Sequence, residues 1–218
     1  MKGFAKTSGI SHQLKTIIWN ASYLLTSNVL VRFVGAAVSV LVARYLGPRD
    51  YGALAVGLAL ASVAGYFTDL GLTHTLIREG TKPGAVYGRL LAGALKLRII
   101  LAAVTTLVLV PGICFLYSDP ALGNVVLAVV IPTIWGGALQ GAGIAYFQMV
   151  QQMQYIALIR VVSGLTTAAA LGVGILLGWP LFAIALSYGV SSLIGAIVSV
   201  VLLFHNVQEG IGGWDSGL

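Results

Sequence analysis

Charged residues are scarce in this chain. Only 8% of its 218 residues are Asp, Glu, Lys or Arg, against about 25% in a typical soluble domain. A water-soluble globule, a disordered chain and a nucleic-acid-binding protein are therefore excluded, because each needs a far more polar surface. The single cysteine, Cys114, excludes an internal disulfide and a cysteine-based metal cluster.

The sequence also lacks the patterns that carry common chemistries. It contains no Walker, Rossmann or Gly-x-Ser-x-Gly motif, and no pair of carboxylates falls within one expected site. Its three histidines, His12, His74 and His205, are dispersed and have no metal-ligand spacing. The sequence therefore predicts no enzyme activity, no cofactor and no metal site.

Apolar residues dominate what remains. They make up 58% of the chain, and the mean hydropathy is +0.97. Glycine, with 28 residues, is well above its usual share of about 7%. Apolar helices that pack closely through small residues are typical of membrane bundles, so the chain is expected to be an integral membrane protein.

Six apolar runs are long enough to cross the hydrocarbon core, which takes about 20 helical residues. The runs are continuous and not alternating, which favours helices over a barrel. Turn residues such as Gly47-Pro48 and Asp119-Pro120 separate them, and Pro132 lies inside the fourth. The sequence thus predicts an all-α polytopic membrane bundle of six transmembrane helices, at Ile17–Tyr45, Tyr51–Leu72, Leu90–Tyr117, Ala121–Phe147, Tyr155–Leu177 and Leu181–Phe204.

The distribution of cations predicts the orientation. Two cations, Arg44 and Arg49, fall in the expected outer loops, and Arg32 lies within the first span. The other nine lie in inner segments or near inner helix ends: Lys2, Lys6, Lys15, Arg78, Lys82, Arg89, Lys96, Arg98 and Arg160. Because Lys and Arg accumulate on the cytoplasmic side, both termini are expected there, in a multi-pass protein of the cell membrane.

This orientation gives three expected regions. Residues 1–16 form a basic cytoplasmic segment, 17–204 the six-helix transmembrane lobe, and 205–218 a cytoplasmic tail. The first apolar run is expected to be retained, because it far exceeds the 7–15 residues of a signal-peptide core.

Small residues recur at four-residue spacing within most of the spans. Such stripes let helix backbones approach closely in lipid. They are open to two interpretations, ordinary bundle packing or surfaces that slide in a transporter. The stripes are Gly57/Ala61/Gly65, Gly137/Gly141, Gly164/Ala168/Gly172 and Ser191/Gly195/Ser199.

Arg32 is the most informative single residue, because it lies near the middle of the first span. A cation at that depth costs at least about 2.5–3.5 kcal/mol on insertion scales, so it must face protein, water or an anion. Asn28 and Ser39 share its helix face at i−4 and i+7. One hypothesis makes Arg32, Asn28 and Ser39 a cavity wall that binds an anionic ligand, since Arg matches phosphate bidentately. The other makes Arg32 a structural partner of Asp69 or of a backbone carbonyl.

Three further charged residues are candidates for ion coupling or gating. Asp69 ends the second span and could pair with Arg78, bind a coupling cation or cap the turn that follows. Lys96 and Arg98 begin the deep part of the third span. They could line an inner vestibule for lipid phosphate, although anionic headgroups alone would also account for them.

Two joints between spans resemble those of a known family. Residues 44–52, RYLGPRDYG, resemble the R-Y-L-G-P-x-x-Y-G joint of polysaccharide flippases of the O-antigen and teichoic-acid type. Asp69-Leu70-Gly71-Leu72 resembles their D-x-G-L motif, and Arg32 before Gly35 is similar to the first helix of the lipid II flippases. These flippases belong to the multidrug/oligosaccharidyl-lipid/polysaccharide exporter superfamily. The similarity covers roughly residues 15–205 and is concentrated in 20–80.

The resemblance implies one MATE-like lobe, alternating access, and a polyprenyl-pyrophosphate-linked oligosaccharide as the cargo of a cell-surface polysaccharide pathway. It places Arg32 at the position of an arginine that faces the central cavity. Full members have a second lobe, so the expected partners are membrane lipids, the glycan substrate and a second lobe or second copy. The chain is then either a truncated lobe that is inactive alone or half of a dimer.

Other functions compete with export of a lipid-linked glycan. A drug or small-solute exporter would share the fold, and a non-transporting structural subunit would share the composition. An intramembrane glycan-modifying or acyl-transfer enzyme would need converging His or carboxylates, which the sequence lacks. Neighbouring glycosyltransferase genes would favour the first function.

Overall fold

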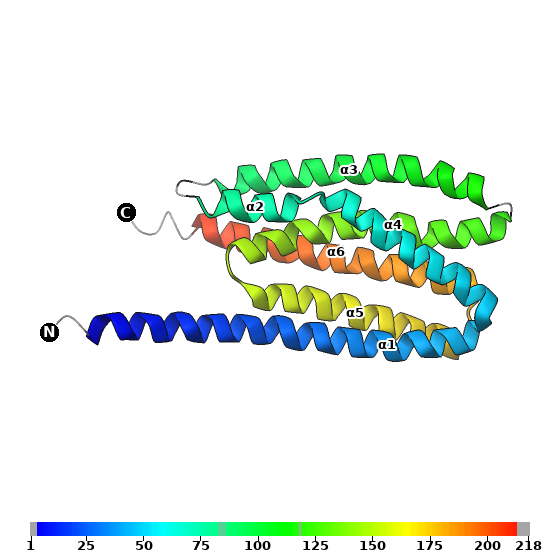
Figure 1. Cartoon of the computed structure of the whole chain (residues 1–218), viewed down its shortest axis with the longest axis horizontal. Coiled ribbons are helices and arrows are strands. Elements are labelled where there is room, and N and C mark those ends of the chain that lie inside the picture. The colour runs from blue at the N-terminus through cyan, green and yellow to red at the C-terminus, as the bar shows by residue number, and fades with distance from the viewer. Residues whose placement is uncertain (1–3, 83, 85, 118, 213–218) are drawn as a thin grey trace.

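The computed structural model describes residues 4–82, 84, 86–117 and 119–212. Lys2 and residues 213–218, which belong to the expected basic segment and tail, lie outside these ranges. The described residues form helices that run lengthwise beside one another (Figure 1). They are α1 (Phe4–Asp69), α2 (Leu72–Gly80), α3 (Tyr87–Leu116), α4 (Pro120–Met149), α5 (Met153–Leu176) and α6 (Leu181–Gly212). The all-α fold class expected from the sequence is confirmed.

Helix α1 contains two of the six expected spans, because it bends sharply at Gly47. This residue has φ 76° and ψ 173°, a backbone conformation that favours glycine. Pro48 follows and begins the second arm, where a missing N–H leaves no helical hydrogen bond unmade. The chain then reverses direction, and the second arm runs back across the bundle toward α2, away from the first arm (Figure 1). Residues 4–46 and 48–69 are the two arms of α1.

A second break, which the sequence did not predict in this form, separates α1 from α2. The second span was expected to run without interruption to Leu72. Instead Leu70 and Gly71 both have positive φ, 37° and 79°, and the chain continues as the short helix α2. That helix covers Arg78, which was expected in a connecting segment.

Helix α4 forms the centre of the bundle and contacts each of the other five helices. Val126, Val129, Ile134 and Phe147 of α4 are almost fully buried. The small-residue stripe of α6 packs against α4. A Cβ on Gly143 would lie 2.1 Å from the Ser199 hydroxyl oxygen, so these two backbones approach as closely as a missing side chain allows.

The connections divide between the two ends of the bundle. The start of α1, the end of α6, the α2–α3 connection and the α4–α5 connection lie at one end, which we call the termini end (Figure 1). The Gly47 bend and the α3–α4 and α5–α6 connections lie at the other end. At that far end, the Tyr45 hydroxyl donates a hydrogen bond of 2.9 Å to the Trp179 carbonyl. It thereby ties the first arm of α1 to the α5–α6 connection.

The exterior is suited to lipid. Within the described residues, five helices are long and apolar enough to cross a membrane, and the bent α1 is counted as one of them. Large apolar side chains stand exposed on the outside, among them Leu107, Phe115 and Leu176 at 75%, 93% and 86%. The five long apolar helices and the many exposed large apolar side chains together are those of a multi-pass membrane protein.

Candidate functional site

Arg32 lies on the first arm of α1 and its side chain is exposed. No hydrogen bond or ion pair joins it to any described residue. It precedes the last residue of the arm, Leu46, by 14 positions, which is about 21 Å of helix. For a hydrocarbon core about 30 Å thick that begins at Leu46, Arg32 lies inside the core, and no described residue supplies its guanidinium with a counter-charge.

The two residues grouped with Arg32 are already engaged inside the bundle. The Asn28 side-chain oxygen accepts a hydrogen bond of 2.7 Å from Nη1 of Arg160 on α5. The Ser39 hydroxyl and the Tyr51 hydroxyl, on the other arm of α1, are 2.7 Å apart. Both residues are half-buried. The face of α1 thus combines one free cation with two polar groups that hold the helix to its neighbours.

Asp69 and Arg98 come together with Thr73 in a polar cluster at the α1–α2 break. One carboxylate oxygen of Asp69, Oδ1, accepts from the Thr73 hydroxyl at 2.7 Å and from the Thr73 backbone N–H at 3.3 Å. Nη2 of Arg98 donates both to that same oxygen and to the Thr73 hydroxyl, the latter at 2.6 Å. We call these three residues the hinge cluster, because they join α3 to both sides of the break.

The ion partner of Asp69 is therefore Arg98, and neither Arg78 nor Arg32. Sequence reasoning missed Thr73, although its i+4 spacing from Asp69 would place it on the same face of a continuing helix. The Asp69–Thr73 backbone contact agrees with the capping alternative, since the carboxylate satisfies one of the free N–H groups at the start of α2.

Arg98 is unusually buried for a cation, with 3% of its side chain exposed. Its Nη1 lies against Gly141 of α4, where a Cβ would be only 1.9 Å away. Its Nε is buried without a hydrogen-bond partner. The hinge cluster joins α1, α2 and α3. Breaking its ion pair is energetically costly, because it leaves a buried charge uncompensated. Lys96, two positions earlier, is exposed.

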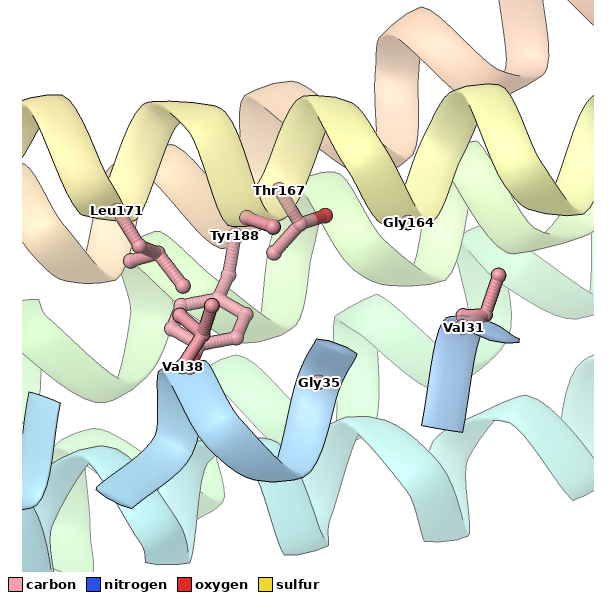
Figure 2. A pocket seen from close by; sticks show the side chains of 8 residues that line it. Val31, Gly35, Val38, Gly164, Thr167, Leu171 and Tyr188 are labelled. Atoms are coloured by element: carbon pink, nitrogen blue, oxygen red, sulfur yellow. The ribbon is translucent and has the colours of Figure 1, made fainter. Parts of the chain in front are cut away.

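An apolar cavity of about 180 Å³ lies beside α1, and residues on both sides of Arg32 in the sequence line it. Figure 2 shows Val31, Gly35 and Val38 of α1 facing Leu171 and Thr167 of α5, with the ring of Tyr188 from α6 between them. The Thr167 hydroxyl is satisfied by the Ser163 carbonyl at 2.9 Å. Apart from the polar groups of Thr167 and Tyr188, the cavity offers mostly apolar surface.

Among the residues that the structure describes, no group of three His, Cys, Asp or Glu side chains comes together that could hold a metal ion. The candidate site therefore consists of two separate features. One is the free guanidinium of Arg32 on an exposed face of α1, and the other is the hinge cluster at the α1–α2 break.

Comparison with models of protein families shows the family to which the chain belongs. The model described as polysaccharide biosynthesis protein matches residues 17–211, which include both features. The chain belongs to the polysaccharide biosynthesis protein family. Members of this family are mostly flippases or transporters and not enzymes. No curated protein and no solved structure matches the chain.

Membership accounts for several properties described above. A multi-pass helical membrane protein that serves polysaccharide biosynthesis agrees with the five spanning helices and the apolar exterior. The resemblance noted in the RYLGPRDYG and Asp69–Leu72 segments is confirmed at the level of the family. In the structure, these two segments are the bend at Gly47 and the break at Leu70–Gly71.

Proposed function

We propose that the chain is the lobe of a flippase that moves a polyprenyl-pyrophosphate-linked oligosaccharide across the cytoplasmic membrane for cell-surface polysaccharide biosynthesis. The observation that carries the proposal is the exposed guanidinium of Arg32, which lies within an apolar span and has no hydrogen bond or ion pair to a described residue. A cation in the hydrocarbon region must meet protein, water or an anion, and no described residue supplies a counter-charge. A pyrophosphate passing along α1 would supply one and would fit the planar donor fork of Arg.

The exposed side of Arg32 also favours a second wall opposite α1. Lipid would not stabilise a bare guanidinium, so this face is better suited to an aqueous path between two lobes. We propose that a second lobe or a second copy of the chain forms that wall. Asn28 and Ser39 then line its edge, where their bonds to Arg160 and Tyr51 fix the shape of the face.

The hinge cluster is suited to gating in this scheme. The α1–α2 break gives α2 a point about which it can move, and Arg98 holds it in one arrangement through Asp69 and Thr73. Alternating access needs an element with two discrete positions. We propose that Asp69 and Arg98 stabilise one of them.

The proposed function is tested most directly in the host cell. Removing the chain should leave lipid-linked oligosaccharide accumulated in the inner leaflet, and the same chain supplied from a plasmid should restore surface polysaccharide. Unchanged surface polysaccharide together with no accumulation would contradict the proposal. Accumulation of a drug or small solute instead would assign the chain to another exporter class.

The purified chain reconstituted as a monomer, at no more than one copy per liposome, should not flip a lipid-linked oligosaccharide. The reason is physical, because one lobe offers only one wall of the path and leaves Arg32 facing lipid. The measurement is the protection of a labelled lipid-linked glycan from an added membrane-impermeant reagent. Robust flipping by a monodisperse monomer would overturn the two-wall proposal.

The orientation can be tested with single cysteines in a Cys114→Ser background. We propose that the termini end is cytoplasmic, on the basis of nine cations against two. Cysteines at Arg49, Asp119 and Gly178 should then react with an impermeant thiol reagent in intact cells. Cysteines at Lys82 and Gln152 should react only after the cells are opened. Labelling of Lys82→Cys from outside would reverse the orientation.

A further inference from the structure

A groove between α2 and α3 lies outside both features of the candidate site. Its volume is about 250 Å³ and its wall is almost entirely apolar, with Leu72 and Leu76 on the α2 side and Leu90 and Leu97 on the α3 side. An apolar cavity of about 150 Å³ already accommodates a molecule as large as benzene. The groove therefore has room for a segment of a hydrocarbon chain.

Two charged residues, Glu79 and Arg89, belong to the wall of the groove. Both carboxylate oxygens of Glu79 accept from Lys82 at 2.6 Å, so this carboxylate is already neutralised by its own loop. Arg89 is exposed, and no hydrogen bond or ion pair joins it to a described residue. The groove thus carries one unpaired positive charge.

Along α3, the positive charge comes first and the apolar wall follows deeper in the bundle. A phospholipid has the same order, with its charged headgroup at the surface and its acyl chains below. Arg89 is the third residue of α3, at the termini end. Leu97 lies eight residues further on, about 12 Å deeper along the helix, and Ile100 beyond it is 47% exposed. Lys96 is on nearly the same helix face as Arg89, two turns deeper, and its long stem lets the ammonium reach back toward the headgroup level.

We infer that the α2–α3 groove binds one anionic phospholipid of the surrounding bilayer, with an acyl chain along Gly93 and Leu97 and the phosphate on Arg89, assisted by Lys96. The assignment of this lipid to the cytoplasmic leaflet rests on the proposed orientation. The groove and its positive charge are independent of that orientation. Cationic side chains next to an anionic membrane surface attract its headgroups. The lipid would pack against both α2 and α3 and so brace the short helix that follows the hinge cluster.

Glycines on α3 supply a matched pair of test variants. Gly93 lines the groove, and a Cβ there would meet nothing within 4 Å. The Cβ of Gly93→Leu therefore enters open space, and its isobutyl group should occupy the groove. Gly112 on the same helix is equally open and is not among the residues that line the groove, so Gly112→Leu controls for added side-chain bulk. Arg89→Gln removes the charge and leaves the groove open.

The experiment is a titration of the purified full chain in detergent with phosphatidylglycerol or with phosphatidylcholine of the same acyl chains, followed by native mass spectrometry. The wild type and Gly112→Leu should bind one phosphatidylglycerol more tightly than phosphatidylcholine. Arg89→Gln should bind phosphatidylglycerol about five-fold more weakly. Gly93→Leu should weaken the binding of both lipids.

Two results would overturn the inference. The first is equal phosphatidylglycerol binding by Arg89→Gln, Gly93→Leu and the wild type, once size-exclusion chromatography has shown that the variants are folded. The second is displacement of the phospholipid by an equimolar polyprenyl phosphate, which would assign the groove to the carrier lipid. Neither depends on flipping activity, so the proposed function can fail without affecting this test.

Discussion

Asp69→Asn should destabilise the protein strongly, by about 3–5 kcal/mol, because it leaves Arg98 buried without its counter-charge. The guanidinium is 3% exposed and lies against Gly141, so it has little room to reach water. Arg98→Met should cost less, since Asp69 is about one-third exposed and keeps its two bonds from Thr73. The measurement is the midpoint of thermal unfolding in detergent for each variant.

A second ion pair in the chain serves as a control for the first. Lys82 and Glu79 are 2.6 Å apart, but their side chains are 54% and 39% exposed. Exposed pairs contribute little to stability, so Glu79→Gln should leave the unfolding midpoint unchanged within error. Equal midpoints for Asp69→Asn and Glu79→Gln would refute a stabilising role for the hinge cluster.

The double variant Asp69→Asn/Arg98→Met separates stability from gating. It removes both charges, so it should recover most of the folded protein that Asp69→Asn loses. If the hinge cluster also gates α2, export should remain impaired although the protein is folded. Full export by the double variant would leave the cluster with a purely structural role.

The spans could be predicted from the sequence because membrane insertion depends on local composition. Each apolar run is long enough by itself to cross the core, and four of the six expected spans begin within three residues of the start of α3, α4, α5 or α6. The bend at Gly47 could also be predicted from the sequence, since glycine permits a positive φ and the proline that follows it interrupts a helix. These features need no information about distant residues.

The polar contacts could not be predicted, because they depend on how the helices are placed around α4. Arg98 meets Asp69 across 29 residues of sequence and Arg160 meets Asn28 across 132. Hydropathy gives the length of a span but not the direction in which one of its side chains points. The break at Leu70–Gly71 was missed for a related reason. A non-glycine residue with φ 37° is disfavoured locally, and here it lies between Asp69 and Thr73, which both accept hydrogen bonds from Arg98 of α3.

Arg32→Ala should abolish export in the host cell while the amount of folded protein stays the same or rises slightly. The side chain makes no hydrogen bond or ion pair with a described residue that its removal could break. Removing a charge from the hydrocarbon region also makes insertion easier. Arg32→Lys should restore only part of the export, because a point charge replaces the bidentate fork that suits a pyrophosphate. The measurements are surface polysaccharide and folded protein level, both in cells whose own chain has been removed.

Arg44→Ala is the matched control, since Arg44 is an exposed arginine on the same arm of α1, near the Gly47 bend. It should reduce export far less than Arg32→Ala, because it lies near the end of the span and not in its middle. Normal export by Arg32→Ala would refute the phosphate-binding role. A fall in folded protein that matches the fall in export would instead make Arg32 a structural residue. The structure opposes that outcome, because Asp69, its expected structural partner, is already bound to Arg98.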